Sequence, residues 1–234
     1  MSRIIGLDVL RGIAVVLMVI FHFCYDLNYF GYWHIDITRA SFWVNFRSLI
    51  VFLFLFIMGV SLALAHRNGV KWEKVKLRTG VLLLSAFVVT VATYMMFPNG
   101  WVYFGILHAI TLFSLIGLIF IGRALLSFVL GVVVLVLYNF FSINMHPLFR
   151  LLKEPLYLPS FTVDLVPFLP WFGVVLLGIA LVGYGLERRV FQNSLLSGES
   201  TLHKQLAQTG RHTLLVYLLH QPLLFGILWT YSIL

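Results

Sequence analysis

Long apolar runs alternate with short polar connections along the whole chain. Hydropathy predicts seven membrane-spanning helices, since about 20 apolar residues are needed to cross a hydrocarbon core about 30 Å thick. The seven segments are Leu10–Phe30, Val44–His66, Thr79–Phe97, Phe104–Ile121, Ala124–Phe141, Phe168–Leu186 and His212–Ile233. Gly122 and Arg123 alone separate the fourth segment from the fifth, which predicts a tight helical hairpin. We therefore predict an all-α integral membrane protein, a polytopic bundle of about seven transmembrane helices that forms one domain over residues 1–234.

The composition supports a membrane protein. Hydrophobic residues make up 61% of the 234 residues and charged residues 10%, with a mean hydropathy of +1.00. Soluble domains carry about 25% charged residues. The single cysteine, Cys24, excludes an internal disulfide, a cysteine-rich zinc site and a C-x-x-C redox motif, and we predict no metal. No cleavage site for a signal peptidase follows the first apolar run, so we expect an uncleaved span.

Positive charges are distributed unevenly between the two sides of the predicted bundle. With a cytoplasmic N-terminus, twelve Lys and Arg residues lie on the inner side and four on the outer side. This positive-inside bias predicts that the N-terminus is cytoplasmic, in a membrane that the compact size suggests is a bacterial inner membrane. The net charge of +8 lies in the connections, and no nucleic-acid-binding module is present. We expect the lipid bilayer, and no nucleic acid, as a partner; a homo-oligomer stays open.

Two predicted connections are long. The outer one, Ser142–Pro167, carries four prolines and is expected to be irregular and packed over the bundle. The inner one, Glu187–Arg211, is polar, and its pattern leaves open a mobile loop or a short interfacial helix.

Three ionisable residues lie on one stripe of the first predicted span. His22 follows Arg11 by eleven residues, which is about 20° past three full turns, and Asp26 follows His22 at i+4. Ionisable groups at membrane depth are costly and favour a functional site. A neutral His22 could accept a proton from a hydroxyl or amine, and Asp26 could orient the ring. The alternatives are a structural His–Asp hydrogen bond and, for Arg11, an interfacial side chain paired with Asp8.

Further histidines could join this site. His108 and His220 fall inside the fourth and seventh predicted spans, where each could line the same cavity as His22 or hydrogen-bond between helices. His34 follows the first span on the outer side and could contact an acceptor.

The inner connection after the second predicted span concentrates positive charge. Five cations lie between positions 67 and 78, among them the four donor-binding candidates Arg67, Lys71, Lys74 and Arg78. Such a segment suits a ligand with several phosphates. It suits anionic lipid headgroups equally well.

Several motifs occur in a consistent order over nearly the whole chain. The first is Arg3-x4-Asp8-x2-Arg11-Gly12, which runs into the apolar helix that carries His22. The others are Met58-Gly59-Val60-Ser61, Phe104-Gly105-Ile106-Leu107-His108, Pro170-Trp171-Phe172-Gly173 with Gly178, and Leu215-Val216-Tyr217-Leu218-Leu219-His220. This ordered set resembles the heparan-α-glucosaminide N-acetyltransferase catalytic domain family. The interval from Arg11 to His22 also resembles the broader membrane acyltransferase-3 group.

The resemblance implies an enzyme that takes an acyl group, typically acetyl, from cytoplasmic acyl-coenzyme A. It implies transfer to an amine or hydroxyl of a carbohydrate-like acceptor at the far side of the membrane. It also implies His22 as the residue nearest the chemistry and Arg11 as its companion on the donor side. In the eukaryotic enzyme, Asn occupies the place of His22 and the active histidine lies in the outer loop, so His34 is a rival for the catalytic role.

Two other classes of protein are alternatives. A transporter for a small polar solute could use His22 and Asp26 as a proton relay, although an odd number of spans argues against a simple inverted repeat. A b-type haem or quinone protein could use His22 together with His108 or His220.

Overall fold

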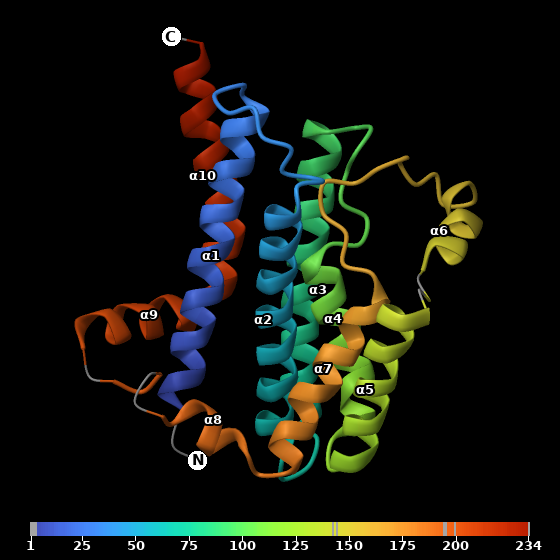
Figure 1. Ribbon diagram of the computed structural model, residues 1–234, viewed down its shortest axis with the longest axis vertical. Coiled ribbons are helices and arrows are strands. Elements are labelled where there is room, and N and C mark those ends of the chain that lie inside the picture. Colours follow the sequence, from blue (N-terminus) through green and yellow to red (C-terminus); the bar gives the residue numbers. More distant parts are fainter. Residues whose placement is uncertain (1–3, 142, 144, 194–195, 199, 234) are drawn as a thin grey trace. The chain divides into compact units, whose positions relative to one another are not determined.

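The computed structural model describes residues 4–233 except 142, 144, 194, 195 and 199, so Arg3 lies outside the described residues. Within this part the regular secondary structure is helical, apart from one isolated bridge between Phe104 and Leu165. The helices are α1 (Ile5–Tyr29), α2 (Ser41–His66), α3 (Trp72–Met96), α4 (Ile106–Gly117) with the 3-10 turn η1 (Leu118–Phe120), α5 (Ala124–Phe141), α6 (His146–Lys153), α7 (Phe168–Gly183), α8 (Glu187–Phe191), α9 (Thr201–Arg211) and α10 (Thr213–Ser232) (Figure 1). The predicted all-α membrane fold is confirmed.

Five of these helices, α1, α2, α3, α5 and α10, are long and apolar enough to cross a membrane. The other two predicted spans are the shorter apolar helices Ile106–Phe120 and Phe168–Gly183. Seven spans and a cytoplasmic N-terminus therefore stay predictions. Gly122, with φ +78°, turns the chain between η1 and α5, where the sequence predicts a tight hairpin.

The connections are more helical than the sequence analysis expects. Residues 72–78 of the basic segment form the first turns of α3, where Glu73 and Lys76 form an i,i+3 ion pair of 3.1 Å. The connection between α5 and α7 is not irregular throughout, because α6 forms with a proline in its first turn, a position that needs no N–H. The connection between α7 and α10 contains the helices α8 and α9, and their place at a membrane interface stays a prediction.

The chain divides into two compact units, and the single-domain prediction remains a prediction. The first unit contains Met1–Phe54 and Glu187–Leu234, which are α1, the first half of α2, and α8 to α10. The second unit contains Leu55–Leu186, which is the rest of α2 and the helices up to α7.

Glycines allow the close helix contacts of the first unit. Figure 1 shows α10 beside α1 and α9 across the N-terminal half of α1. A Cβ at Gly12 would collide with the backbone of Leu206, and a Cβ at Gly210 would collide with the carbonyl oxygen of Asp8. Farther along α1, a buried apolar cluster fills the space toward α2, with Val15, Met18, Phe21, Cys24, Ile37 and Ile50 as its members.

Glycines also allow close helix contacts in the second unit. A Cβ at Gly59 of α2 would meet the backbone of Val175 in α7, and a Cβ at Gly178 would meet the backbone of Phe56. Small residues let helix backbones approach closely, which drives helix association in membranes where apolar burial does not. Gly59 and Gly178 both belong to the motifs quoted above, so their place in those motifs has a packing explanation.

Candidate active site

Two histidines meet where α1 and α10 pack together. The rings of His22 and His220 are in edge-to-face contact, with centroids 4.7 Å apart and planes at 70°. Nδ1 of His22 lies 2.9 Å from the carbonyl oxygen of Met18, and Nδ1 of His220 lies 2.6 Å from that of Tyr217. A carbonyl only accepts hydrogen bonds, so each Nδ1 must carry the proton and donate it. Both neutral rings are thereby fixed in the tautomer whose Nε2 is an unprotonated base.

Asp26 lies one turn after His22 on α1, and Gln221 directly follows His220 on α10. Asp26 is 1% exposed, and its Oδ1 accepts a hydrogen bond of 2.7 Å from the Gln221 side-chain amide. Three buried polar atoms in this region have no hydrogen-bond partner: Oδ2 of Asp26, Oε1 of Gln221 and Nε2 of His220. Leaving such atoms unsatisfied is costly, and native proteins do so mainly where a ligand or water completes the site. We call His22, Asp26, His220 and Gln221 the α1–α10 cluster.

The structure differs from the sequence analysis in what orients His22. The expected partner is Asp26, whereas the observed partner of Nδ1 is the Met18 carbonyl. Helical side chains point toward the N-terminus, so His22 reaches back to position i−4 and away from Asp26 at i+4. Gln221, which sequence reasoning missed, is the observed partner of Asp26. The available signal was a second polar residue beside His220 within a predicted span.

Arg11 lies on α1, as His22 does, but its side chain pairs with Asp8 and not with the α1–α10 cluster. Its guanidinium is 2.6 Å from the Asp8 carboxylate, and Arg211 of α9 approaches the same carboxylate at 3.9 Å. Eleven residues separate Arg11 from His22, which is about 16 Å along the helix axis. Arg11 therefore pairs within α1, whereas Arg211 connects the same carboxylate to α9. Any contact of Arg11 with a donor would be made through its partly exposed side.

His34 is exposed on the connection that follows α1. The neighbouring Asp36 is engaged in a local turn, where it accepts hydrogen bonds from the Thr38 hydroxyl (2.8 Å) and the Arg39 amide (3.0 Å). The Thr38 hydroxyl and the Arg39 amide hold the pKa of Asp36 below its ordinary value. His34 thus lacks the buried setting that His22 has.

His108 of the second unit has protein partners for both ring nitrogens. Its Nδ1 lies 3.3 Å from the Gly105 amide, which donates, and its Nε2 lies 3.2 Å from the Thr90 hydroxyl. That hydroxyl donates to the Val102 carbonyl at 2.8 Å, so it accepts from Nε2. The ring joins α3 to the start of α4 as a satisfied structural group.

This network predicts a measurable coupling. We expect His108→Ala and Thr90→Val each to lower the free energy of unfolding by about 1 kcal/mol, because each removes a hydrogen bond from a partly buried site. The double variant should lose less than the sum of the two, since both substitutions break the same bond. Thermal denaturation of the four proteins in one detergent measures this, and strict additivity would contradict the network.

A cavity of about 240 Å³ lies among α2, α3 and α4 in the second unit. Its lining includes His66, Lys74 and Arg78, together with apolar side chains and Ser114. Two of the four cationic donor-binding candidates therefore line a cavity of the second unit. Arg67 and Lys71 precede α3 and are exposed.

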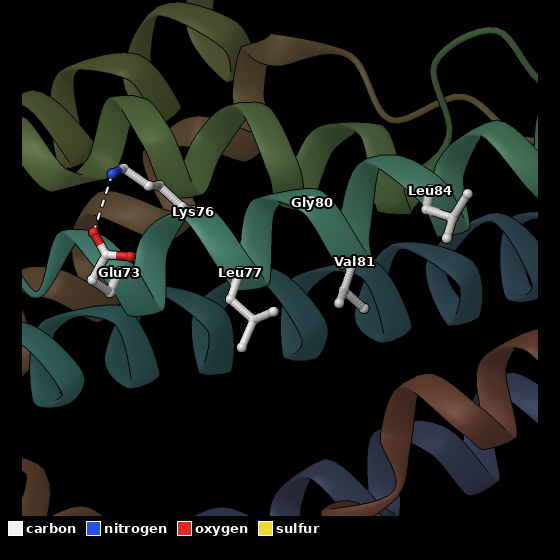
Figure 2. Close-up of a pocket in the computed structure, with 6 residues that line it drawn as sticks. All are labelled: Glu73, Lys76, Leu77, Gly80, Val81 and Leu84. Carbon is white, nitrogen blue, oxygen red and sulfur yellow. Dashed lines mark hydrogen bonds and ion pairs between the residues drawn. The ribbon is translucent and has the colours of Figure 1, made fainter.

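A second hollow, of about 530 Å³, follows one face of α3. Figure 2 shows Leu77, Val81 and Leu84 along this face and the Glu73–Lys76 ion pair at its start. The hollow is open and apolar beyond that pair, which fits a helix face turned to lipid more than a site of chemistry. Among the residues that the structure describes, no group of three His, Cys, Asp or Glu side chains could hold a metal ion.

The family described as heparan-alpha-glucosaminide N-acetyltransferase, catalytic, matches residues 3–222. The resemblance predicted from the sequence motifs is thereby confirmed. The matched range contains the α1–α10 cluster, Arg11 and the basic segment. No curated protein and no solved structure matches the chain.

Proposed function

On the premise that the chain belongs to the heparan-α-glucosaminide N-acetyltransferase catalytic family, we propose a specific reaction for it. The enzyme moves an acetyl group from cytoplasmic acetyl-CoA, or another acyl group from its acyl-CoA, to an amine or hydroxyl of a carbohydrate-like acceptor. We further propose seven spans with the N-terminus in the cytoplasm, in a bacterial inner membrane.

One observation carries the proposal: a histidine within a membrane-spanning helix is held as a base by a backbone carbonyl. Fixing Nδ1–H on Met18 leaves Nε2 of His22 ready to accept a proton. His22 is half-buried, whereas His220 is 8% exposed, so His22 is the better placed of the two to meet a substrate. Asp26 and Gln221 bring buried acceptor atoms that suit the hydroxyl or amino groups of an acceptor.

The reaction balances without a further reactant. The acceptor oxygen or nitrogen attacks the thioester carbonyl while Nε2 of His22 takes its proton. The carbon–sulfur bond then breaks, and coenzyme A leaves as a thiolate that takes up the proton from the imidazolium. Direct transfer of this kind is simpler than an acyl-histidine intermediate, which ping-pong kinetics would indicate.

The donor is proposed to meet the cations on the cytoplasmic side. Lys74 and Arg78 are the best supported of the candidates because they line a cavity together with His66. Arginine and lysine recognise phosphates, and coenzyme A carries several. Arg67, Lys71 and Arg11 would add to the positive potential at this side.

This assignment predicts a charge effect on donor binding. The double variant K74A/R78A is expected to weaken coenzyme A binding at least tenfold. Added salt should also weaken the binding of coenzyme A to the unmodified protein. Isothermal titration in detergent measures both effects. K76A is the matched control, because Lys76 is on the same helix, outside that cavity and paired with Glu73. Equal losses in the two variants would indicate a nonspecific charge effect.

The transporter and the haem or quinone protein have no supporting observation. The rings of His22 and His220 are in direct contact, which leaves no room between them for an iron with a ligand on each side. The acetyltransferase proposal is tested by the melting temperature of the purified protein with acetyl-CoA, with coenzyme A and an unrelated nucleotide for comparison. A selective, saturable rise is expected, and the absence of any rise at millimolar acetyl-CoA would count against it.

A further inference from the structure

We infer that His220 is the positioning residue that holds the proton of His22 during the reaction, so that the two histidines act as one base. The role in catalysis rests on the proposed function, whereas the sharing of a proton does not. The inference replaces Asp26, the partner expected from sequence, by a histidine on another helix.

The inference rests on the tautomers of the two histidine rings. Each ring donates Nδ1–H to the carbonyl of its own helix, Met18 for His22 and Tyr217 for His220. Each Nε2 is therefore a lone pair, and two lone pairs cannot hydrogen-bond to each other. This explains why Nε2 of His220 is buried without a partner although another imidazole touches its ring.

A single proton changes this relation. When His22 takes a proton from the acceptor, its Nε2 becomes a donor, and Nε2 of His220, in the ring that touches it, is an unprotonated acceptor. A charge-assisted N–H···N bond then stabilises the imidazolium. In this arrangement the Met18 carbonyl occupies the Nδ1–H position that the carboxylate has in a Ser-His-Asp triad, and His220 would hold the transferred proton on Nε2 until it passes to the thiolate.

The contact between the rings of His22 and His220 favours one added proton on the pair and disfavours a second. Tyr217 on α10 is in ring contact with the pair, 5.6 Å from His220, and the buried Asp26 on α1 accepts a hydrogen bond from Gln221, the residue next to His220. A second proton would place two cations in contact, so like-charge repulsion favours a single proton on the pair. The pair is thus suited to accept one proton from the acceptor and return it to the thiolate of coenzyme A.

Solid-state NMR of the full chain in liposomes, with ¹⁵N-labelled histidine, tests the pair directly. We expect both residues in the Nδ1–H tautomer at high pH. On acidification, a nitrogen–nitrogen coupling across the hydrogen bond between the two Nε2 atoms should appear. The coupling should vanish in H220F, while the tautomer of His22 remains. Its absence at every pH at which the protein stays folded would overturn the inference.

Kinetics then separate a positioning role from a structural one. With acetyl-CoA as donor, H220F is expected to lower kcat at least tenfold with little change in the KM for acetyl-CoA. H220Q, whose amide oxygen still accepts a hydrogen bond, should recover part of the rate. H212Q, the same substitution at an exposed histidine, is the matched control. Equal activity of H220F and the unmodified protein would overturn the role of His220. A protein that shows the coupling but transfers no acetyl group would instead contradict the proposed function.

Discussion

Replacing His22 by alanine is expected to lower acetyl transfer by a factor of about 10² to 10⁴, the usual contribution of a general base. The affinity for acetyl-CoA should stay within about twofold, because the proposed donor contacts involve the cytoplasmic cations. Initial rates of coenzyme A release, together with the dissociation constant for acetyl-CoA, measure the two effects separately. A parallel loss of binding and rate would point to misfolding.

H34A is the variant that separates the rival assignment. His34 is exposed and outside the α1–α10 cluster, so its loss should leave most of the rate. Retained turnover in H22A with loss in H34A would move the chemistry to the outer connection. Loss in both variants would indicate that His34 contacts the acceptor while His22 remains the base.

The substitution G210A is expected to lower the free energy of unfolding by about 3 kcal/mol, at the upper end of overpacking effects. A methyl group at this position would collide with the carbonyl oxygen of Asp8, and a backbone atom cannot rotate aside as a side chain can. Displacing α9 would also separate Arg211 from the buried Asp8 carboxylate. Thermal unfolding in detergent should show a lower midpoint, and limited proteolysis should cleave near α9 first.

G226A provides a control with the opposite expected sign. Gly226 lies in α10 with nothing within 4 Å of a Cβ placed there. Replacing a helical glycine that has open space around it by alanine normally stabilises a helix by about 0.5–1 kcal/mol. The same chemical change should therefore destabilise at one glycine and stabilise slightly at the other. Similar midpoints for both variants would contradict the close contact of α1 and α9.

Much of the fold follows from hydropathy alone. Every predicted span coincides with a helix, because runs of apolar residues in lipid must satisfy their backbone groups internally. The predicted segments Leu10–Phe30 and Thr79–Phe97 begin later than α1 and α3. Hydropathy detects only the part of a helix that is apolar enough to lie in lipid, and each helix also extends beyond that part into water. Helix α6 was missed because four prolines dominate its connection, although the first of them fits a helix start.

The candidate site was predicted only in part. The stripe of Arg11, His22 and Asp26 pointed to α1, the helix that carries His22 and Asp26 of the α1–α10 cluster, but periodicity within one helix cannot say which other helix packs against it. Gln221 and the contact of His220 with His22 are products of tertiary packing. Likewise, His108 has the same pattern in the sequence as His22 and His220, and only the structure shows that both its ring nitrogens have protein partners, Gly105 and Thr90.

The central claim is that a chain of this acetyltransferase family performs acetyl transfer at His22. The most direct test supplies labelled acetyl-CoA and a panel of amino- and hydroxyl-bearing carbohydrates to the protein in liposomes, and compares it with the H22A variant. We predict acetylation of at least one acceptor by the unmodified protein, and a rate at least 100-fold lower in H22A, in line with the loss of a general base. Equal rates for the two proteins, or acetyl-CoA that binds and is never consumed with any acceptor, would contradict the account.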